Sequence, residues 1–201
     1  YTGEAVILLR AGTYTMPAPL TLTATDAALS SGQLTLRAYP DETVVLQGCT
    51  QETAWIDCHN GLFRTPLPTE PAEQSRQVFW NGMVQPRARH PNRDSSHPYS
   101  GGFLYAAEPA AGASRQTFTV RPGDIPPEFW PDLESAALWV WPAAGGPPLR
   151  SRITGADQQT RVLCLENAAE TPLTKGSRYV LERSFDFLDA PGEWYHDQAR
   201  Q

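Results

Sequence analysis

Lysine is almost missing from this sequence, and cysteine is scarce. Lys175 is the single lysine, so no lysine-rich segment is present to act as a localisation signal or a membrane tether. Three cysteines allow at most one internal disulfide, which excludes a disulfide scaffold. No apolar stretch approaches the ~20 residues that a membrane-spanning helix needs. We therefore expect no membrane partner.

An excess of positive charge is also missing. The formal net charge is -6, whereas a nucleic-acid-binding domain normally has a basic patch. We therefore expect no nucleic-acid partner. The chain opens on Tyr1 rather than Met and shows no signal-peptide pattern, which indicates an excised or processed piece of a longer protein.

Proline and short alternating runs dominate what the sequence does contain. The 201 residues include 19 Pro and 15 Gly, which argues against long helices and for many turns. Apolar residues make up 40%, which is typical of a chain with a buried core. Short apolar or alternating runs, separated by turn residues, predict an all-β fold. The predicted strands are residues 5–9, 20–23, 34–37, 43–46, 62–64, 116–120, 136–141, 150–154, 161–165 and 179–182.

Two local signals refine this prediction. Asn81-Gly82 stands between two apolar pairs, which predicts a tight hairpin because a type I′ turn needs positive φ at both central residues. Three prolines between Ile125 and Leu133 allow at most one helical turn there. Changes in composition near residues 53 and 180 predict three parts: residues 1–52, 53–180 and 181–201.

Seven short segments, spread over the whole chain, resemble segments of one class of enzyme. They are ILLRAGTY at 7–14, PLTLT at 19–23, LRAYPDETVVLQG at 36–48, FWNG at 79–82, RARHPN at 87–92, RYVLE at 178–182 and LDAPGEWY at 188–195. Together they resemble the N-terminal region of bacterial right-handed parallel β-helix glycoside hydrolases of the fucosidase and xylanase types.

The resemblance implies a fold and a parent protein. Residues 1–52 would be opening rungs of the β-helix, residues 53–180 an inserted β-sandwich- or barrel-like module, and residues 181–201 the return to the β-helix. The parent would be a secreted or cell-surface hydrolase acting on plant or host polysaccharide, with carbohydrate and the remaining β-helix as partners. The family's catalytic carboxylates would lie beyond Gln201, so we expect no catalytic residue, cofactor or metal in this chain.

Two other functions remain open from the residues alone. The chain could be a stand-alone carbohydrate-binding module, or a structural cap that blocks the open end of a solenoid, as terminal units of repeat proteins do. Exposed side chains at Trp130, Trp139 and Trp141 would favour the binding module. Unpaired β-helix edges would favour the enzyme fragment.

A polar string next to the predicted hairpin supplies the first candidate ligand contacts, which are Arg87, Arg89, His90 and Asn92. Arginine forks and an amide can bind sugar hydroxyls or a carboxylate. The alternative is a structural role, which we favour. In that role the string lies beside the return segment 188–195, and Arg89 pairs with Asp189 or Glu193.

Trp139 and Trp141 are the second candidate pair. Side chains alternate along a strand, so the two indoles point to the same face and Val140 points to the other. If exposed, they would offer aromatic surfaces on which sugar rings stack. If buried, they belong to the core of the module, which is the interpretation we favour because large apolar residues are usually buried.

We interpret two further clusters, one of carboxylates and one of cysteine and histidine, as structural. The carboxylates Asp186, Asp189, Glu193 and Asp197 suggest a glycosidase pair, which needs a separation of about 5–5.5 Å or ~6.5–9.5 Å. Because Pro191-Gly192 bends the chain between them, we interpret them as a turn cap and an ion-pair partner. Cys49, Cys58 and His59 are zinc-ligand types, but their spacing is not that of a zinc site.

Overall fold

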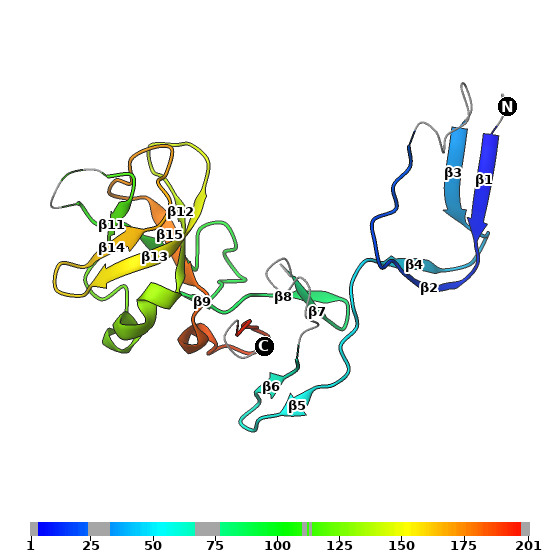
Figure 1. The fold of residues 1–201 in the computed structure, drawn as a ribbon, viewed down its shortest axis with the longest axis horizontal. Helices are drawn as coiled ribbons and strands as arrows, with labels where there is room; N and C mark the ends of the chain where they lie inside the picture. The colour runs from blue at the N-terminus through cyan, green and yellow to red at the C-terminus, as the bar shows by residue number, and fades with distance from the viewer. Residues whose placement is uncertain (1–3, 24–32, 67–76, 110–111, 113, 198–201) are drawn as a thin grey trace. The chain divides into compact units, whose positions relative to one another are not determined.

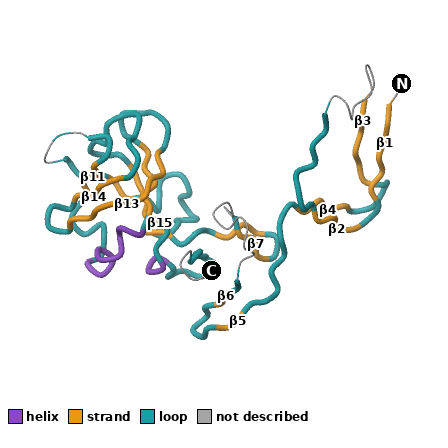
Figure 2. The backbone as a smooth tube through the Cα atoms, viewed as in Figure 1, coloured by secondary structure: helices purple, strands orange, loops and turns teal. Residues whose placement is uncertain are grey.

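The computed structural model describes residues 4–23, 33–66, 77–109, 112 and 114–197 (Figure 1). The chain divides into two compact units, Tyr1–Pro66 (unit 1) and Leu67–Gln201 (unit 2). Strands are the main regular secondary structure of both units, with little helix, which confirms the predicted all-β character at this level (Figure 2). The three-part division at residues 53 and 180 stays a prediction.

Unit 1 begins with two parallel strand pairs. Strand β1 (Glu4–Leu9) pairs with β3 (Gln33–Ala38), and β2 (Gly12–Thr15) pairs with β4 (Val44–Gln47). The chain therefore returns alongside itself twice in the same direction. Three of the four strands predicted in this region are confirmed.

The apolar side chains of these pairs remain exposed. Val6, Ile7 and Leu8 of β1 and Val45 and Leu46 of β4 are each more than two-fifths exposed. None of residues 5–23 and 34–66 is buried. A two-stranded sheet has no second layer against which to bury a face, so these residues form no core of their own.

The remainder of unit 1 gives one correction and one confirmation. Residues 20–23 form no strand, so that prediction is wrong. Pro17 and Pro19, just before these residues, have no backbone N–H, so they cannot donate the hydrogen bonds that would begin a strand pairing. Strands β5 (Ile56–Asp57) and β6 (Phe63–Arg64) form a short antiparallel hairpin, which confirms the strand predicted at 62–64.

Unit 2 opens with a second hairpin, formed by β7 (Val78–Trp80) and β8 (Met83–Gln85). Asn81 and Gly82 at its tip have φ angles of 49° and 77°. Positive φ at both central residues is the requirement of a type I′ turn, so the predicted tight hairpin is confirmed.

The main body of unit 2 is a seven-stranded sheet in the order β10-β15-β12-β13-β14-β11, with β9 pairing with β15 as well (Figure 1). All its pairings are antiparallel. Its strands are β9 (Arg89–His90), β10 (Leu104–Tyr105), β11 (Thr117–Thr119), β12 (Ala137–Trp141), β13 (Leu149–Asp157), β14 (Val162–Leu165) and β15 (Arg178–Glu182). The five strands predicted for this region from residue 116 onward are confirmed.

One face of this sheet encloses the core of unit 2. Leu138 and Val140 of β12 are fully buried there, together with Tyr179 and Leu181 of β15. The sheet curls, because Phe118 of β11 packs edge-on against Tyr179 with 4.6 Å between ring centroids. Strands β11 and β15 are not neighbours in the sheet order, so this contact closes the core.

A 3₁₀ helix covers part of this core and corrects a prediction. Helix η2 runs from Pro127 to Ser135, longer than the single turn that the prolines seemed to allow. Pro127 lies in its first turn, where a fixed φ is favourable and the missing backbone N–H would have no hydrogen-bond acceptor within the helix. Trp130 and Leu133 of this helix are buried, so tertiary packing stabilises it despite Pro131.

The segment that enters the sheet lies beside the segment that leaves it. The Ala88 amide donates to the Trp194 carbonyl at 2.8 Å, and the Trp194 amide donates to the Pro86 carbonyl at 3.1 Å. The Trp194 indole also donates to the Gln85 carbonyl at 3.2 Å. The expected neighbourhood of the polar string and the return segment is confirmed.

Candidate ligand-binding face

The second face of the seven-stranded sheet presents arginine and tryptophan side chains, which follow from the strand register. In one cross-strand row, Arg152 of β13, Ala137 of β12, Glu182 of β15 and Arg89 of β9 lie in line. Directly paired residues of antiparallel strands point to the same face. The next rows therefore add further side chains to what we call the outer face. These are Arg150, Trp139 and Val180, then Trp141, Arg178 and Tyr105.

Trp139 and Trp141 form a stacked pair on the outer face. Their ring centroids are 5.2 Å apart and their planes differ by 15°. Trp139 is 36% exposed and Trp141 is half-buried, whereas Val140 between them is fully buried. Their expected common face is confirmed, but their assignment to the core is wrong. The core already takes Leu138 and Val140 from the opposite face of β12, which leaves the indoles outside.

Phe103 and Arg178 extend this stack beyond Trp141. The Phe103 ring meets Trp141 edge-on at 5.5 Å. The Arg178 guanidinium lies 5.0 Å from the Trp141 ring and 4.5 Å from the Phe103 ring, and it donates to the Tyr99 carbonyl at 3.0 Å. We call Trp139, Trp141 and Phe103 the aromatic stack. Because Phe103 and Arg178 flank Trp141, the exposed end of the aromatic stack is Trp139.

Arg89 is fixed by backbone carbonyls rather than by a carboxylate. Its guanidinium donates to Pro91 O at 2.9 Å and to Gly102 O, and it lies 5.2 Å from the Phe103 ring. The predicted ion pair with Asp189 or Glu193 is therefore wrong. Burial lowers the pKa of Arg89 and raises the pKa of Glu193, so both groups lose hydration without meeting in an ion pair.

The other members of the polar string do not join Arg89 in one site. The Arg87 guanidinium stacks 4.2 Å from the Trp194 ring, and burial lowers its pKa. His90 points to the core, where Nε2 lies 2.8 Å from the Asp124 carbonyl and the ring packs between Phe129 and Phe187. Asn92 lies in an exposed loop. Of the six residues predicted to bind ligand, Arg89, Trp139 and Trp141 share the outer face.

A cleft of about 230 Å³ opens over the row that contains Ala137. We call it the arginine cleft, and it is lined by Ala137, Arg150, Ser151, Arg152, Glu166, Asn167 and Arg183. Arg150 Nη2 lies 3.0 Å from Glu182 Oε2, and this carboxylate is largely buried beneath it. The cleft arises because Ala137 has only a methyl group where its neighbours in the row have long side chains.

The sequence did contain a signal for this cleft. Arg150 and Arg152 alternate with Ser151 and Ile153 along one predicted strand, so both arginines had to share the face opposite the apolar residues. Arg183 follows β15 with a φ of 66°, and no residue pattern predicted that it would line the cleft. The contribution of Arg178 and Phe103 depends on the pairing of β10 with β15, which was not predicted.

A second cleft, of about 260 Å³, lies next to η2. Trp130 lines it, but this side chain is only 8% exposed and its indole donates to the Ile125 carbonyl at 3.3 Å. Of the three tryptophans proposed as a test of ligand binding, Trp130 therefore belongs to the core. The outer face remains the better candidate.

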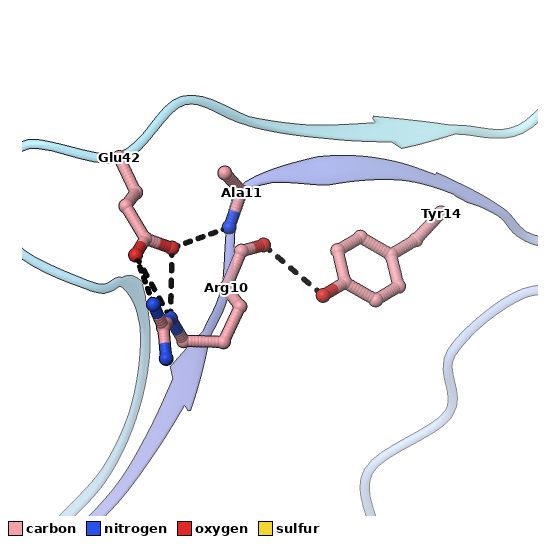
Figure 3. A network of polar contacts seen from close by, with 4 residues as sticks. All are labelled: Arg10, Ala11, Tyr14 and Glu42. Atoms are coloured by element: carbon pink, nitrogen blue, oxygen red, sulfur yellow. Dashed lines mark hydrogen bonds and ion pairs between the residues drawn. The ribbon is translucent and has the colours of Figure 1, made fainter.

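The most connected polar cluster of unit 1 surrounds Glu42 (Figure 3). Its carboxylate accepts from Arg10 Nε at 2.9 and 3.0 Å and from the Ala11 amide at 2.5 Å. Tyr14 donates to the Arg10 carbonyl at 3.0 Å. The Arg10 hydrogen bonds lower the pKa of Glu42. This cluster joins the turn after β1 to the turn before β4, so its role is structural.

The acidic residues of the return segment make turn contacts. The Ser184 hydroxyl accepts from the Asp186 amide at 3.3 Å, and Glu193 accepts from the Ala190 amide at 3.3 Å, as turn caps do. Cys49, Cys58 and Cys164 are free thiols. Within the described ranges, no three His, Cys, Asp or Glu side chains gather as metal ligands would.

Two further findings complete this description. In the part of the chain that the structure describes, no helix has the length and apolar character needed to cross a membrane. No protein-family model, curated protein or solved structure gave a match to this chain.

Proposed function

We propose that this chain is the non-catalytic, carbohydrate-binding N-terminal portion of a secreted bacterial glycoside hydrolase, and that the outer face of unit 2 contacts the saccharide. The observation that supports this most is the exposed aromatic stack ending at Trp139. An indole at the edge of a complete core can contact a ligand without any change in that core, which is what a binding role requires.

The chemistry of the outer face suits a sugar. Aromatic faces stack on the apolar C–H patches of pyranose rings, and guanidinium groups donate several hydrogen bonds to hydroxyls. Trp139 is paired in register with Arg150 of the neighbouring strand, so both kinds of contact are available side by side. Trp139, Trp141 and Arg89 are the sequence-predicted contacts that this proposal retains.

Unit 1 supports the β-helix part of the proposal. In a solenoid each turn stacks in parallel on the previous one and buries its apolar face only when neighbours are present. The two successive parallel pairs and the exposed apolar residues of β1 and β4 fit opening rungs of this kind. We propose that further rungs of the same protein cover these residues. Unit 2 would then be the inserted module, with its entry and exit joined at Ala88 and Trp194.

A stand-alone carbohydrate-binding module is the second candidate. The observation that favours it is the core of unit 2, which is formed by residues of unit 2 itself. Both candidates use the same outer face, and they differ in whether unit 1 needs additional rungs.

Binding of the full chain to a panel of plant and host polysaccharides tests the shared claim. We expect Trp139→Ala to weaken binding about tenfold, which corresponds to the ~1.4 kcal/mol of one stacking contact. Trp80→Ala is the matched control, because Trp80 is exposed on the β7–β8 hairpin, which is a separate two-stranded sheet. An equal loss in both variants, or no binding to any polysaccharide, would refute the proposal. Turnover of an aryl fucoside or xyloside by this chain would refute its non-catalytic part.

A further inference from the structure

We infer that the arginine cleft binds the carboxylate of a uronic acid residue, while Trp139 stacks on the sugar ring. The inference rests on the proposed function, because it names the class of saccharide that the same face would select. It uses a part of the face that the sequence did not single out, namely Arg150 and Arg152 around Ala137.

The strand register places two arginines of the cleft beside the aromatic stack. Ala137 forms its floor, and Arg152 lies beside it in the same cross-strand row. Arg150 lies one row further, next to Trp139 in register. A group bound between the two guanidiniums is therefore adjacent to the exposed end of the aromatic stack. Guanidinium forks match the two oxygens of a carboxylate and bind them bidentately.

Glu182 positions Arg150 and offsets one positive charge beside the cleft. Its carboxylate is largely buried and bonds one terminal nitrogen of Arg150 at 3.0 Å. A guanidinium has five N–H donors, so Arg150 keeps donors for a ligand after this bond is made. Arg152 is exposed at the same cleft. The bond to Glu182 therefore orients Arg150 before a ligand binds.

The charge on the outer face favours an anion. The strand positions of this face include four arginines, Arg89, Arg150, Arg152 and Arg178, and one carboxylate, Glu182. This local surplus occurs in a chain whose formal net charge is -6. A local excess of one sign raises the concentration of oppositely charged ligands at that surface. Glu166 also lines the cleft, and its negative charge repels an anion. Removing that charge therefore tests the inference.

A sugar acid suits the cleft better than a nucleic acid. Nucleic-acid sites follow the backbone with an extended groove of positive charge that contacts several phosphates. Here the cleft is a compact hollow of about 230 Å³ rather than an extended groove, and the Trp139–Trp141 pair is stacked on itself, so only one end of it offers a free ring. One charge beside one stacking surface is the pattern of a single uronate residue.

The test compares ligands that differ only in charge. Calorimetric titration of the full chain uses oligosaccharides of galacturonic, glucuronic and mannuronic acid, each beside its carboxyl-reduced neutral counterpart. We expect one acidic oligosaccharide to bind at least about tenfold more tightly than its neutral counterpart. Raising the salt from low to high concentration should weaken only the acidic ligand, because salt screens exposed charges.

Three variants link this preference to the cleft. Arg152→Ala should remove most of the preference for the acidic ligand, weakening the acidic ligand several-fold more than the neutral one. Glu166→Gln should strengthen binding of the acidic ligand alone, because it removes a repulsive charge. Lys175→Ala is the matched control for loss of one positive charge, since Lys175 is exposed in the turn before β15, at the far end of that strand from Glu182. Thermal unfolding of each variant confirms that it is folded.

The outcomes separate this inference from the proposed function. Equal affinity for acidic and neutral ligands, with Trp139→Ala still weakening both, overturns the inference and leaves the proposed function standing. Tighter binding of inorganic phosphate or a single-stranded oligonucleotide than of any uronate also overturns it. If no saccharide binds, both the inference and the proposed function are wrong.

Discussion

The strands of unit 1 leave their apolar side chains exposed, whereas the sheet of unit 2 encloses its own. Leu36 of β3 and Leu138 of β12 make the contrast concrete, since both are strand leucines but their exposures are 41% and 0%. Parallel pairs of two strands bury a face only when another layer or rung is added. A curled antiparallel sheet brings its own distant strands together, as Phe118 and Tyr179 do.

This difference explains where a binding surface can form. A ligand face must be rigid before the ligand arrives, and rigidity comes from a packed layer beneath it. Trp139 and Arg150 stand on strands whose other face is the core of unit 2. The exposed residues of β1 and β4 have no such layer beneath them, so they suit packing against further strands, such as the rungs of the proposed β-helix.

The largest expected effect comes from separating the two units. Residues 67–201 alone should unfold cooperatively, because their core is formed within unit 2. Residues 1–66 alone should show no cooperative transition, because none of residues 5–23 and 34–66 is buried. Differential scanning calorimetry of each piece checks this. A cooperative transition in residues 1–66 would break the comparison.

The matched leucines give the next largest effect. Leu138→Ala should destabilise the chain by about 2–5 kcal/mol, the cost of a cavity in a packed core. Leu36→Ala should change the free energy of unfolding by less than about 0.5 kcal/mol, as substitutions at exposed positions do. Urea titration measures both values. Similar losses in the two variants would mean that unit 1 is packed more closely than described.

A buried hydrogen bond in unit 2 gives a smaller effect. The Tyr179 hydroxyl donates to Asp124 Oδ2 at 3.0 Å, and burial raises the pKa of Tyr179. Tyr179→Phe should cost about 1.5–3 kcal/mol, because a hydrogen bond to a charged group is lost. Chemical denaturation provides the value. Unchanged stability would show that water replaces the hydroxyl at this position.

The smallest effect concerns the exposed Glu42 cluster of unit 1. The folded pKa of Glu42 is lower than its ordinary value because Arg10 donates to it. Its contribution to stability is therefore present above the ordinary pKa and is lost as the pH falls through the lowered value. An NMR titration should find this carboxyl titrating below the ordinary glutamate range, and Arg10→Gln should move it back. A pKa that Arg10→Gln leaves unchanged would contradict the contact.

The features that the sequence predicted well depend on local rules. Asn81-Gly82 specifies its turn through its own φ angles, and the alternating runs from 116 onward specify their strands. The errors depend on tertiary structure. Helix η2 forms because Trp130 and Leu133 are buried, and the Trp139–Trp141 pair is exposed because the other face of β12 already fills the core. No residue pattern shows which of two apolar faces will be covered.

The central claim is that the outer face of unit 2 is a saccharide-binding surface built on a complete core. Titrating the chain with its tightest-binding oligosaccharide, while following the indole N–H signals of its six tryptophans by NMR, tests this most directly. The account predicts that Trp139 shifts most, Trp141 less, and that Trp130 and Trp80 stay in place. Shifts confined to Trp80 or Trp130, with Trp139 unchanged, would contradict it.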